Sequence, residues 1–149
     1  MTEEPKKNKD WEKYESFVVT LGKWAWIIVL INAIATFFYG IWVLVWEGRF
    51  WWIWRVGVAY GIYLIASAVL IAVLAFIIVK PRFSDKCAAK DWDYIFNDVL
   101  VIGNARIPWM LIIGIVLEIF GLWWWGGLAV LIPMIILLAA GPKPYKWKK

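Results

Sequence analysis

Two long stretches of this sequence contain no charged residue. The first runs from Trp24 to Trp46 and the second from Val56 to Val79, and both consist mainly of aliphatic and aromatic residues. Apolar runs of about 20 residues are typical of helices that cross a membrane. A third run of 36 residues, from Ile107 to Pro142, contains Glu118 as its single charge. Because this run is long enough for two helices and a turn, the sequence predicts four membrane-spanning helices.

The composition supports a membrane protein and argues against several classes of function. Hydrophobic residues make up 64% of the 149-residue chain and charged residues 18%, whereas a soluble domain is about half apolar and about a quarter charged. With no His and one Cys, the chain lacks the ligands of typical zinc, copper and haem sites, so we expect no cofactor. The sequence shows no phosphate-binding loop, nucleophile elbow or other catalytic constellation, and we expect a protein that is not an enzyme.

The basic residues are distributed unevenly around the apolar runs. Of the 16 Lys and Arg residues, 14 precede the first run, follow the second run or come after the last one. Only Arg49 and Arg55 fall in loops on the opposite side. By the positive-inside rule, this asymmetry places both termini and the middle loop in the cytoplasm. The net charge of +5 is therefore a topology signal, and no nucleic-acid partner is expected.

A weak internal repeat indicates two related units. The segment 9–42 returns as 90–123, with ten of 34 positions identical. Each copy opens with apolar residues at helical spacing, a pattern typical of an amphipathic helix that lies in the headgroup plane. Gly22 in the first copy and Gly103 in the second then stand where the chain is expected to bend into the membrane.

These patterns together predict an all-α integral membrane protein whose four transmembrane helices form two tandem helical hairpins, each preceded by an amphipathic interfacial helix. The predicted boundaries are a polar tail at 1–8; a first unit at 9–83 with an interfacial helix at 10–22 and spans at 24–46 and 55–79; a second unit at 84–145 with an interfacial helix at 91–105 and spans at 107–122 and 126–141; and a basic tail at 146–149. The second hairpin is short, with about 24 Å of helix per span against a hydrocarbon core of about 30 Å. It must thin the bilayer, borrow length from the surface helix or stop short of the far side.

Glu118 is the main candidate for chemistry. It lies about 16 Å along the predicted helix from Ile107, and small residues on its face turn it towards the other helices. A carboxyl group within a membrane is a candidate for proton or cation handling, and the other interpretation is a structural group that is protonated, hydrogen-bonded or paired with Arg55. The residues that complete this candidate polar site are Asn32, Thr36, Tyr63 and Arg55.

Small residues form stripes that are typical of close helix contacts. Gly40 follows Asn32 and Thr36 at four-residue spacing, Gly57 and Gly61 make a Gly-x-x-x-Gly motif, and Gly114 and Gly121 share the face of Glu118. Such faces serve either contacts within the chain or contacts with a second copy or another membrane subunit. The sequence therefore leaves both a homo-oligomer and partner membrane subunits open.

Tryptophan and lysine mark the expected membrane surfaces. Eight of the 14 Trp residues crowd the predicted outer boundary, which is typical of an aromatic belt, although a docking surface for a partner or glycan is the alternative. At the other surface, the residues expected to attract anionic lipid headgroups are Lys143, Lys146, Lys148 and Lys149. Membrane lipids are thus the partners that the sequence predicts most directly.

Two hypotheses about function follow. In architecture alone, paired hairpins with cytoplasmic termini and surface helices resemble the membrane-shaping proteins of the reticulon kind. The first hypothesis is therefore a non-enzymatic, multi-pass (tetraspan) membrane protein that acts as a scaffold, a membrane-shaping element or an accessory subunit of a membrane complex. The alternative is a small transporter or channel component in which Glu118 handles protons or cations.

Overall fold

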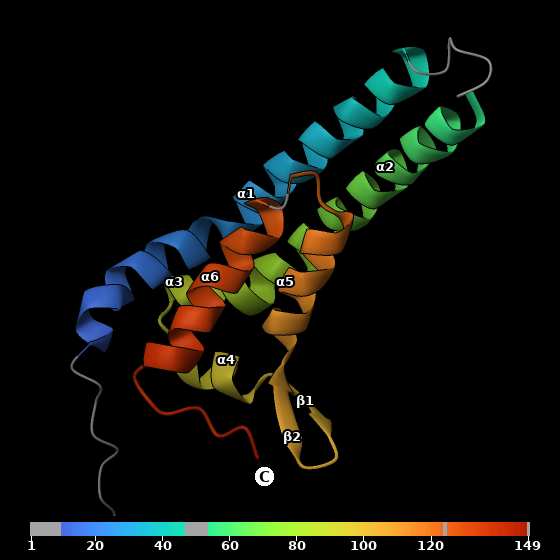
Figure 1. The fold of residues 1–149 in the computed structure, drawn as a ribbon. Coiled ribbons are helices and arrows are strands. Elements are labelled where there is room, and N and C mark those ends of the chain that lie inside the picture. The colour runs from blue at the N-terminus through green and yellow to red at the C-terminus, as the bar shows by residue number, and fades with distance from the viewer. Residues whose placement is uncertain (1–9, 47–53, 124, 149) are drawn as a thin grey trace, which may run out of the picture.

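The computed structural model describes residues 10–46, 54–123 and 125–148, and this part of the chain is mostly helical (Figure 1). Its elements are α1 (Trp11–Trp46), α2 (Trp54–Leu74), the π-helix η2 (Ala75–Ser84), α3 (Asp85–Ala88), α4 (Trp92–Asn97), β1 (Val99–Ile102), β2 (Ala105–Pro108), α5 (Trp109–Phe120) and α6 (Trp125–Ala140). Two helices, α1 and the continuous helix from Gly57 to Ala88, are long and apolar enough to cross a membrane.

The first of these long helices, α1, is continuous where the sequence predicted two elements. The interfacial helix expected at 10–22 and the span expected at 24–46 form one helix of 36 residues without a break at Gly22. A Cβ atom added to Gly22 would lie 2.5 Å from the Sγ atom of Cys87, so glycine serves here to let α3 approach α1 closely. The predicted bend at Gly22 is therefore wrong, because this glycine makes a helix contact.

The second long helix continues beyond its predicted end. After α2, the chain passes without interruption through η2, which contains Pro81, and on into α3. Proline lacks an N–H group and clashes with the carbonyl four residues earlier, and the wider turns of a π-helix accommodate it. The Asp85 N–H donates to the Lys80 carbonyl in this five-residue pattern. The extension packs on α1, where the backbone N–H of Trp26 donates to the Ser84 hydroxyl oxygen at 3.2 Å.

The second interfacial helix, predicted at 91–105, is helical only in α4. The following residues form an antiparallel hairpin of β1 and β2, with Ile102 opposite Ala105. Gly103, in the two-residue turn, has a φ of +61°, a conformation that glycine adopts without strain. The prediction of helix is therefore wrong for this segment. Its β-branched residues around a Gly-Asn pair favour a hairpin instead.

In the second hairpin, α5 is shorter than predicted and α6 has its predicted length. Helix α5 has 12 residues and α6 has 16, which correspond to about 18 Å and about 24 Å of helix. A complete crossing requires about 20 residues. Four membrane-spanning helices are thus not confirmed. The described chain contains two long helices with one short hairpin packed against them (Figure 1).

The core lies between α1 and the helices on either side of it. Helix α1 packs against α2, η2, α3 and α6, and α5 packs against α6 and α2. Val29 of α1, Leu117 of α5 and Met134 of α6 are all buried in this core. Trp11 and Trp92, which are equivalent in the internal repeat, contact each other edge to face with their ring centroids 5.2 Å apart.

Candidate functional site

The turn of the α5–α6 hairpin is hydrogen-bonded to α1. The Asn32 side-chain amide donates to the Leu122 carbonyl oxygen at 2.6 Å, and the Leu122 N–H donates to the Thr36 hydroxyl oxygen at 3.3 Å. The Thr36 hydroxyl in turn donates to the Asn32 carbonyl oxygen at 2.8 Å. Asn32 and Thr36 are only 1% and 0% exposed. Two buried side chains thus satisfy both backbone polar groups of Leu122, as buried polar groups require.

This anchor lies half-way along the charge-free stretch of α1. Thr36 is about 18 Å from Trp24 along the helix, in a stretch (24–46) that is about 34 Å long. Figure 1 shows that α1 and α2 extend well beyond the α5–α6 turn. Along one half of this stretch, α1 and α2 are accompanied by the packed helices α5 and α6. Along the other half, the described part of the chain contains only α1 and α2.

Two glycines allow the hairpin turn to approach Asn32. A Cβ atom added to Gly121 would lie 2.9 Å from the Asn32 Oδ1 atom, and one added to Gly126 would lie 2.9 Å from the Asn32 Cγ atom. Any larger residue at Gly126 therefore pushes Asn32 away from the turn. Trp123, between these glycines, has a positive φ of 56°. That conformation costs a non-glycine residue about 1–2 kcal/mol, so the surrounding contacts must hold the turn in place.

Glu118 lies on α5 against the first turn of α6. A Cβ atom added to Gly127 would lie 2.7 Å from the Glu118 Cγ atom, and the backbone N–H of Leu128 is hydrogen-bonded to the Glu118 carboxyl group. The N-terminal end of a helix has unpaired N–H groups and a partial positive charge, so an acidic residue stabilises it. Within the described residues, the buried Oε1 atom of Glu118 has no hydrogen-bond partner. Glu118 thus has a structural contact and one unpaired oxygen.

Tyr63 joins Asn32 and Thr36 at the hairpin tip. The Tyr63 hydroxyl donates to the Ile119 carbonyl oxygen at 3.4 Å. Together with Tyr39 and Tyr60, Tyr63 lines an open cavity of about 500 Å³ between α1, α2 and the hairpin turn. The structure thus brings three of the predicted polar residues to one turn and places Glu118 one residue from the cavity wall. The side chain of Arg55, the fifth residue of that set, lies outside the described residues.

The other predicted packing glycines lie at contacts within the chain. Gly40 on α1 and Gly61 on α2 face each other, and a Cβ atom on either would lie 3.1 Å from the carbonyl oxygen of the other. A Cβ atom on Gly114 would lie 2.6 Å from the Leu131 side chain of α6, and Gly57 is buried. Gly40 and Gly61 therefore set the spacing of α1 against α2, and Gly114 sets that of α5 against α6.

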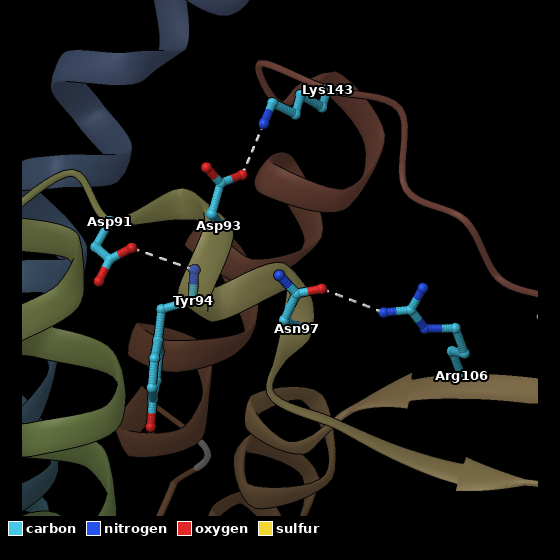
Figure 2. Close-up of polar contacts among 6 residues, drawn as sticks. All are labelled: Asp91, Asp93, Tyr94, Asn97, Arg106 and Lys143. Atoms are coloured by element: carbon cyan, nitrogen blue, oxygen red, sulfur yellow. Dashed lines mark hydrogen bonds and ion pairs between the residues drawn. The ribbon is translucent and has the colours of Figure 1, made fainter.

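A second group of polar contacts lies at the end of the molecule that holds α4 and the β-hairpin (Figure 2). At the start of α4, the Asp91 carboxylate accepts from the Tyr94 N–H at 3.2 Å and from Lys86 at 3.1 Å. The hydrogen bond from Lys86, followed by the one from Tyr94, lowers the pKa of Asp91 below its ordinary value of 3.8. Asp91 therefore caps α4 in its charged form.

Two further contacts of this group involve basic side chains. The Lys143 ammonium group donates to Asp93 at 2.8 Å, and the Arg106 guanidinium donates to the Asn97 side-chain oxygen at 3.4 Å (Figure 2). Lys143 and Asp93 are 53% and 71% exposed, so this ion pair contributes little to stability. Arg106, which the sequence analysis did not single out, lines the same cleft as Lys143, one of the predicted headgroup residues.

The C-terminal segment is docked along β2. The Tyr145 hydroxyl donates to the Arg106 carbonyl oxygen at 3.0 Å, the Arg106 N–H donates to the Trp147 carbonyl oxygen at 2.9 Å, and Lys148 forms a bridge with Ala105. Burial raises the pKa of Tyr145, and the nearby charge of Arg106 opposes this effect. The sequence analysis missed this docking, although the aromatic residues at 145 and 147 have the two-residue spacing of an extended strand.

The other predicted headgroup residues have different surroundings. Lys146 and Lys148 are exposed, and Lys149 lies outside the described residues.

In the part of the chain that the structure describes, no three His, Cys, Asp or Glu side chains are arranged to hold a metal ion. The chain matches no protein-family model, no curated protein and no solved structure at a significant level.

Proposed function

We propose that this chain is an integral membrane protein without enzymatic activity that shapes the membrane by expanding its cytoplasmic leaflet. In this proposal, α1 and the helix from Gly57 to Ala88 cross the bilayer. The α5–α6 hairpin enters from the cytoplasmic side and turns back at mid-depth. The supporting observation is the hydrogen-bonded anchor of Leu122 on Asn32 and Thr36. The orientation follows from the excess of basic residues near the termini and the middle loop.

A turn inside a membrane needs hydrogen-bond partners within the protein, and the α5–α6 turn has them at Leu122. Lipid tails cannot hydrogen-bond to a peptide group, so non-helical backbone at membrane depth must find its partners within the protein. Asn32 and Thr36 supply these partners to Leu122. If all four helices crossed completely, as the sequence predicts, the turn would have to lie about 15 Å farther along α1, near Trp46. Both hydrogen bonds would then be lost.

The proposed arrangement has a wedge shape. Two additional helices, each about 10–12 Å across, occupy the cytoplasmic half and add roughly 200 Å² to that leaflet. Helices α3 and α4 and the β-hairpin lie at the same end of the molecule (Figure 1). A protein that adds area to one leaflet bends the bilayer so that this leaflet is convex. The wedge is therefore expected to favour membranes that curve towards the cytoplasm.

Reconstitution into liposomes tests this proposal. At rising protein-to-lipid ratios, electron cryomicroscopy should show smaller vesicles or tubules. The double variant Asn32→Leu/Thr36→Val, which releases the turn from α1, should shape them less. Thr20→Val is the matched control, because Thr20 is exposed on the same helix. Liposomes that keep their shape although the protein is fully incorporated would contradict the proposal. Stoichiometric co-purification of a membrane partner would instead favour an accessory subunit.

A small transporter or channel component is the second candidate. The observation that favours it is the unpaired Oε1 atom of Glu118 beside Ile119, which lines the cavity of about 500 Å³. In this case, Glu118→Gln should abolish proton or cation flux into proteoliposomes while leaving the protein folded. If the parent protein shows no flux, or if the variant retains it, this second function is refuted.

A further inference from the structure

We propose that the cleft between α4, β2 and the C-terminal segment binds a single phosphate group, carried by a lipid headgroup or free in solution. This cleft has a volume of about 150 Å³. Three basic side chains line it, namely Arg106, Lys143 and Lys146, together with one acidic side chain, Asp93, and the Tyr145 ring. Three positive charges and one negative charge leave a net charge of +2 around the cleft, which favours an anion that carries two charges.

Arg106 is held ready to bind such an anion. Its N–H and its carbonyl group are fixed by Trp147 and Tyr145 of the C-terminal segment, and its guanidinium group contacts Asn97 (Figure 2). A planar guanidinium can donate two parallel hydrogen bonds to a phosphate, and little entropy is lost when its position is already fixed. Residues distant in sequence thus converge on one arginine.

Lys143 and Lys146 supply the additional charge. Lys143 contacts Asp93 in an exposed ion pair, which is weak enough to exchange for a contact with phosphate. Lys146 is exposed at the same cleft. Phe96 and Tyr145 also line the cleft, and their ring centroids lie 6.0 Å apart. The cleft is therefore lined by cationic donors and two aromatic rings.

The size of the cleft restricts the ligand. A water molecule occupies about 30 Å³ in the liquid, so the cleft holds the equivalent of about five waters. Sites for nucleotide-sized or drug-sized ligands are usually about 300–1,000 Å³. A phosphate group with its bound waters fills the cleft, and the remainder of a larger ligand would lie outside it. A phosphomonoester carries more charge than a phosphodiester, and we therefore expect it to be preferred.

Titration of the full-length protein in detergent tests the proposal, with calorimetry and phosphorus NMR as readouts. The probes are sodium phosphate, a short-chain phosphatidic acid and a phosphatidylglycerol with the same acyl chains. Saturable binding of the first two with a preference over phosphatidylglycerol supports the proposal. Tighter binding of phosphatidic acid than of phosphate identifies a lipid as the source, and equal binding identifies free phosphate. Because a charge-assisted hydrogen bond is lost, Arg106→Gln should weaken binding about tenfold or more.

A charge-matched control separates the cleft from general attraction. Lys13→Gln removes one positive charge from a side chain that is 77% exposed on α1, outside the cleft, and it should leave the affinity unchanged. If Arg106→Gln does not fold, Lys146→Gln replaces it and should weaken binding at least threefold. The proposal is overturned if binding is not saturable, if phosphatidylglycerol binds as well as phosphatidic acid, or if the control variant loses as much affinity as the cleft variant.

Discussion

Replacing Thr36 with Val tests the hairpin anchor with a small change in shape. The Thr36 hydroxyl accepts the Leu122 N–H at 3.3 Å and donates to the Asn32 carbonyl at 2.8 Å. Valine keeps the branched side chain but leaves the partly buried N–H of Leu122 without a partner, which costs about 1–3 kcal/mol. The lost bond to the Asn32 carbonyl costs less, because that carbonyl also accepts the ordinary helix hydrogen bond. We therefore expect Thr36→Val to lower the free energy of unfolding by about 1–2 kcal/mol.

The companion variant Asn32→Leu should lower the free energy of unfolding more than Thr36→Val does. It removes the donor to the Leu122 carbonyl and places a branched side chain against Gly121 and Gly126, for a loss of about 2–5 kcal/mol. Because both variants act on Leu122, their effects should not add, and a double-mutant cycle should show a coupling of at least about 0.5 kcal/mol. Two additive effects would mean that Asn32 and Thr36 do not share one anchor.

Reversible unfolding in mixed detergent micelles measures these differences. Thr20→Val, the same substitution at an exposed site of α1, should change the free energy of unfolding by less than about 0.5 kcal/mol. The reasoning is refuted if Thr36→Val also leaves the free energy of unfolding unchanged, since removing a hydroxyl that holds the turn must destabilise the protein. Circular dichroism of each variant at low denaturant confirms that the helices are retained before the energies are compared.

Three further predictions concern the close contacts and the end of the molecule that holds α4 and the β-hairpin. Gly126→Ala should destabilise the protein by about 1–3 kcal/mol, measured by thermal unfolding, because the new Cβ lies 2.9 Å from the Asn32 Cγ atom; unchanged stability would show that the turn does not press on α1. Gly103→Ala should cost about 1 kcal/mol through its positive φ, although nothing lies within 4 Å of the added Cβ; no loss would argue against the β-hairpin turn. Hydrogen bonding to Lys86 lowers the pKa of Asp91, so the stability that this carboxylate contributes to the folded protein is complete above pH 3.8 and is lost as the pH falls through the folded-state pKa. Asp91→Asn should remove this step from a pH titration of the free energy of unfolding. A variant that keeps the step would show that another group is responsible.

The sequence predicts the two long helices well because their signal is local. A stretch without charge that is longer than 20 residues has few other stable conformations. The prediction is less successful where a distant residue decides the structure. Gly22 was predicted to bend the chain, but it instead allows the close approach of Cys87, which lies 65 positions later in the chain. Likewise, the second span was predicted to end at residue 79, but the helix continues through Pro81 as a π-helix.

The sequence contains a signal for the β-hairpin, which the prediction from helical spacing did not use. A run rich in β-branched residues (Val99–Ile102) before Gly103-Asn104, with Ile107 after it, favours a two-residue hairpin turn. The helical spacing of the apolar residues in both copies favoured a helix there, and in the first copy the matched residues do form one. Matched residues thus have different structures, with Gly22 inside α1 and Gly103 in a turn. A sequence identity of ten positions in 34 did not impose the same local fold on both copies.

The candidate site was predicted in part. Asn32, Thr36 and Tyr63 were chosen as polar residues within apolar helices, and the structure places all three at the hairpin turn. Their partners are backbone groups of α5 and the turn, which no residue pattern reveals. The short second hairpin was noted from its length, and of the three ways in which it could meet the membrane, the contact between Leu122 and mid-α1 favours the half-crossing.

The depth of the α5–α6 turn in a lipid bilayer tests the central proposal most directly. A spin label at Trp123→Cys, in a Cys87→Ala background, reports this depth through its accessibility to oxygen and to a water-soluble nickel reagent; Trp123 suits it because its side chain is 76% exposed. The half-crossing hairpin places the label near the bilayer centre, about 18 Å from the level of Trp24, accessible to oxygen and shielded from nickel. A label that lies at the outer headgroups, as deep as one at Arg49→Cys, would contradict it.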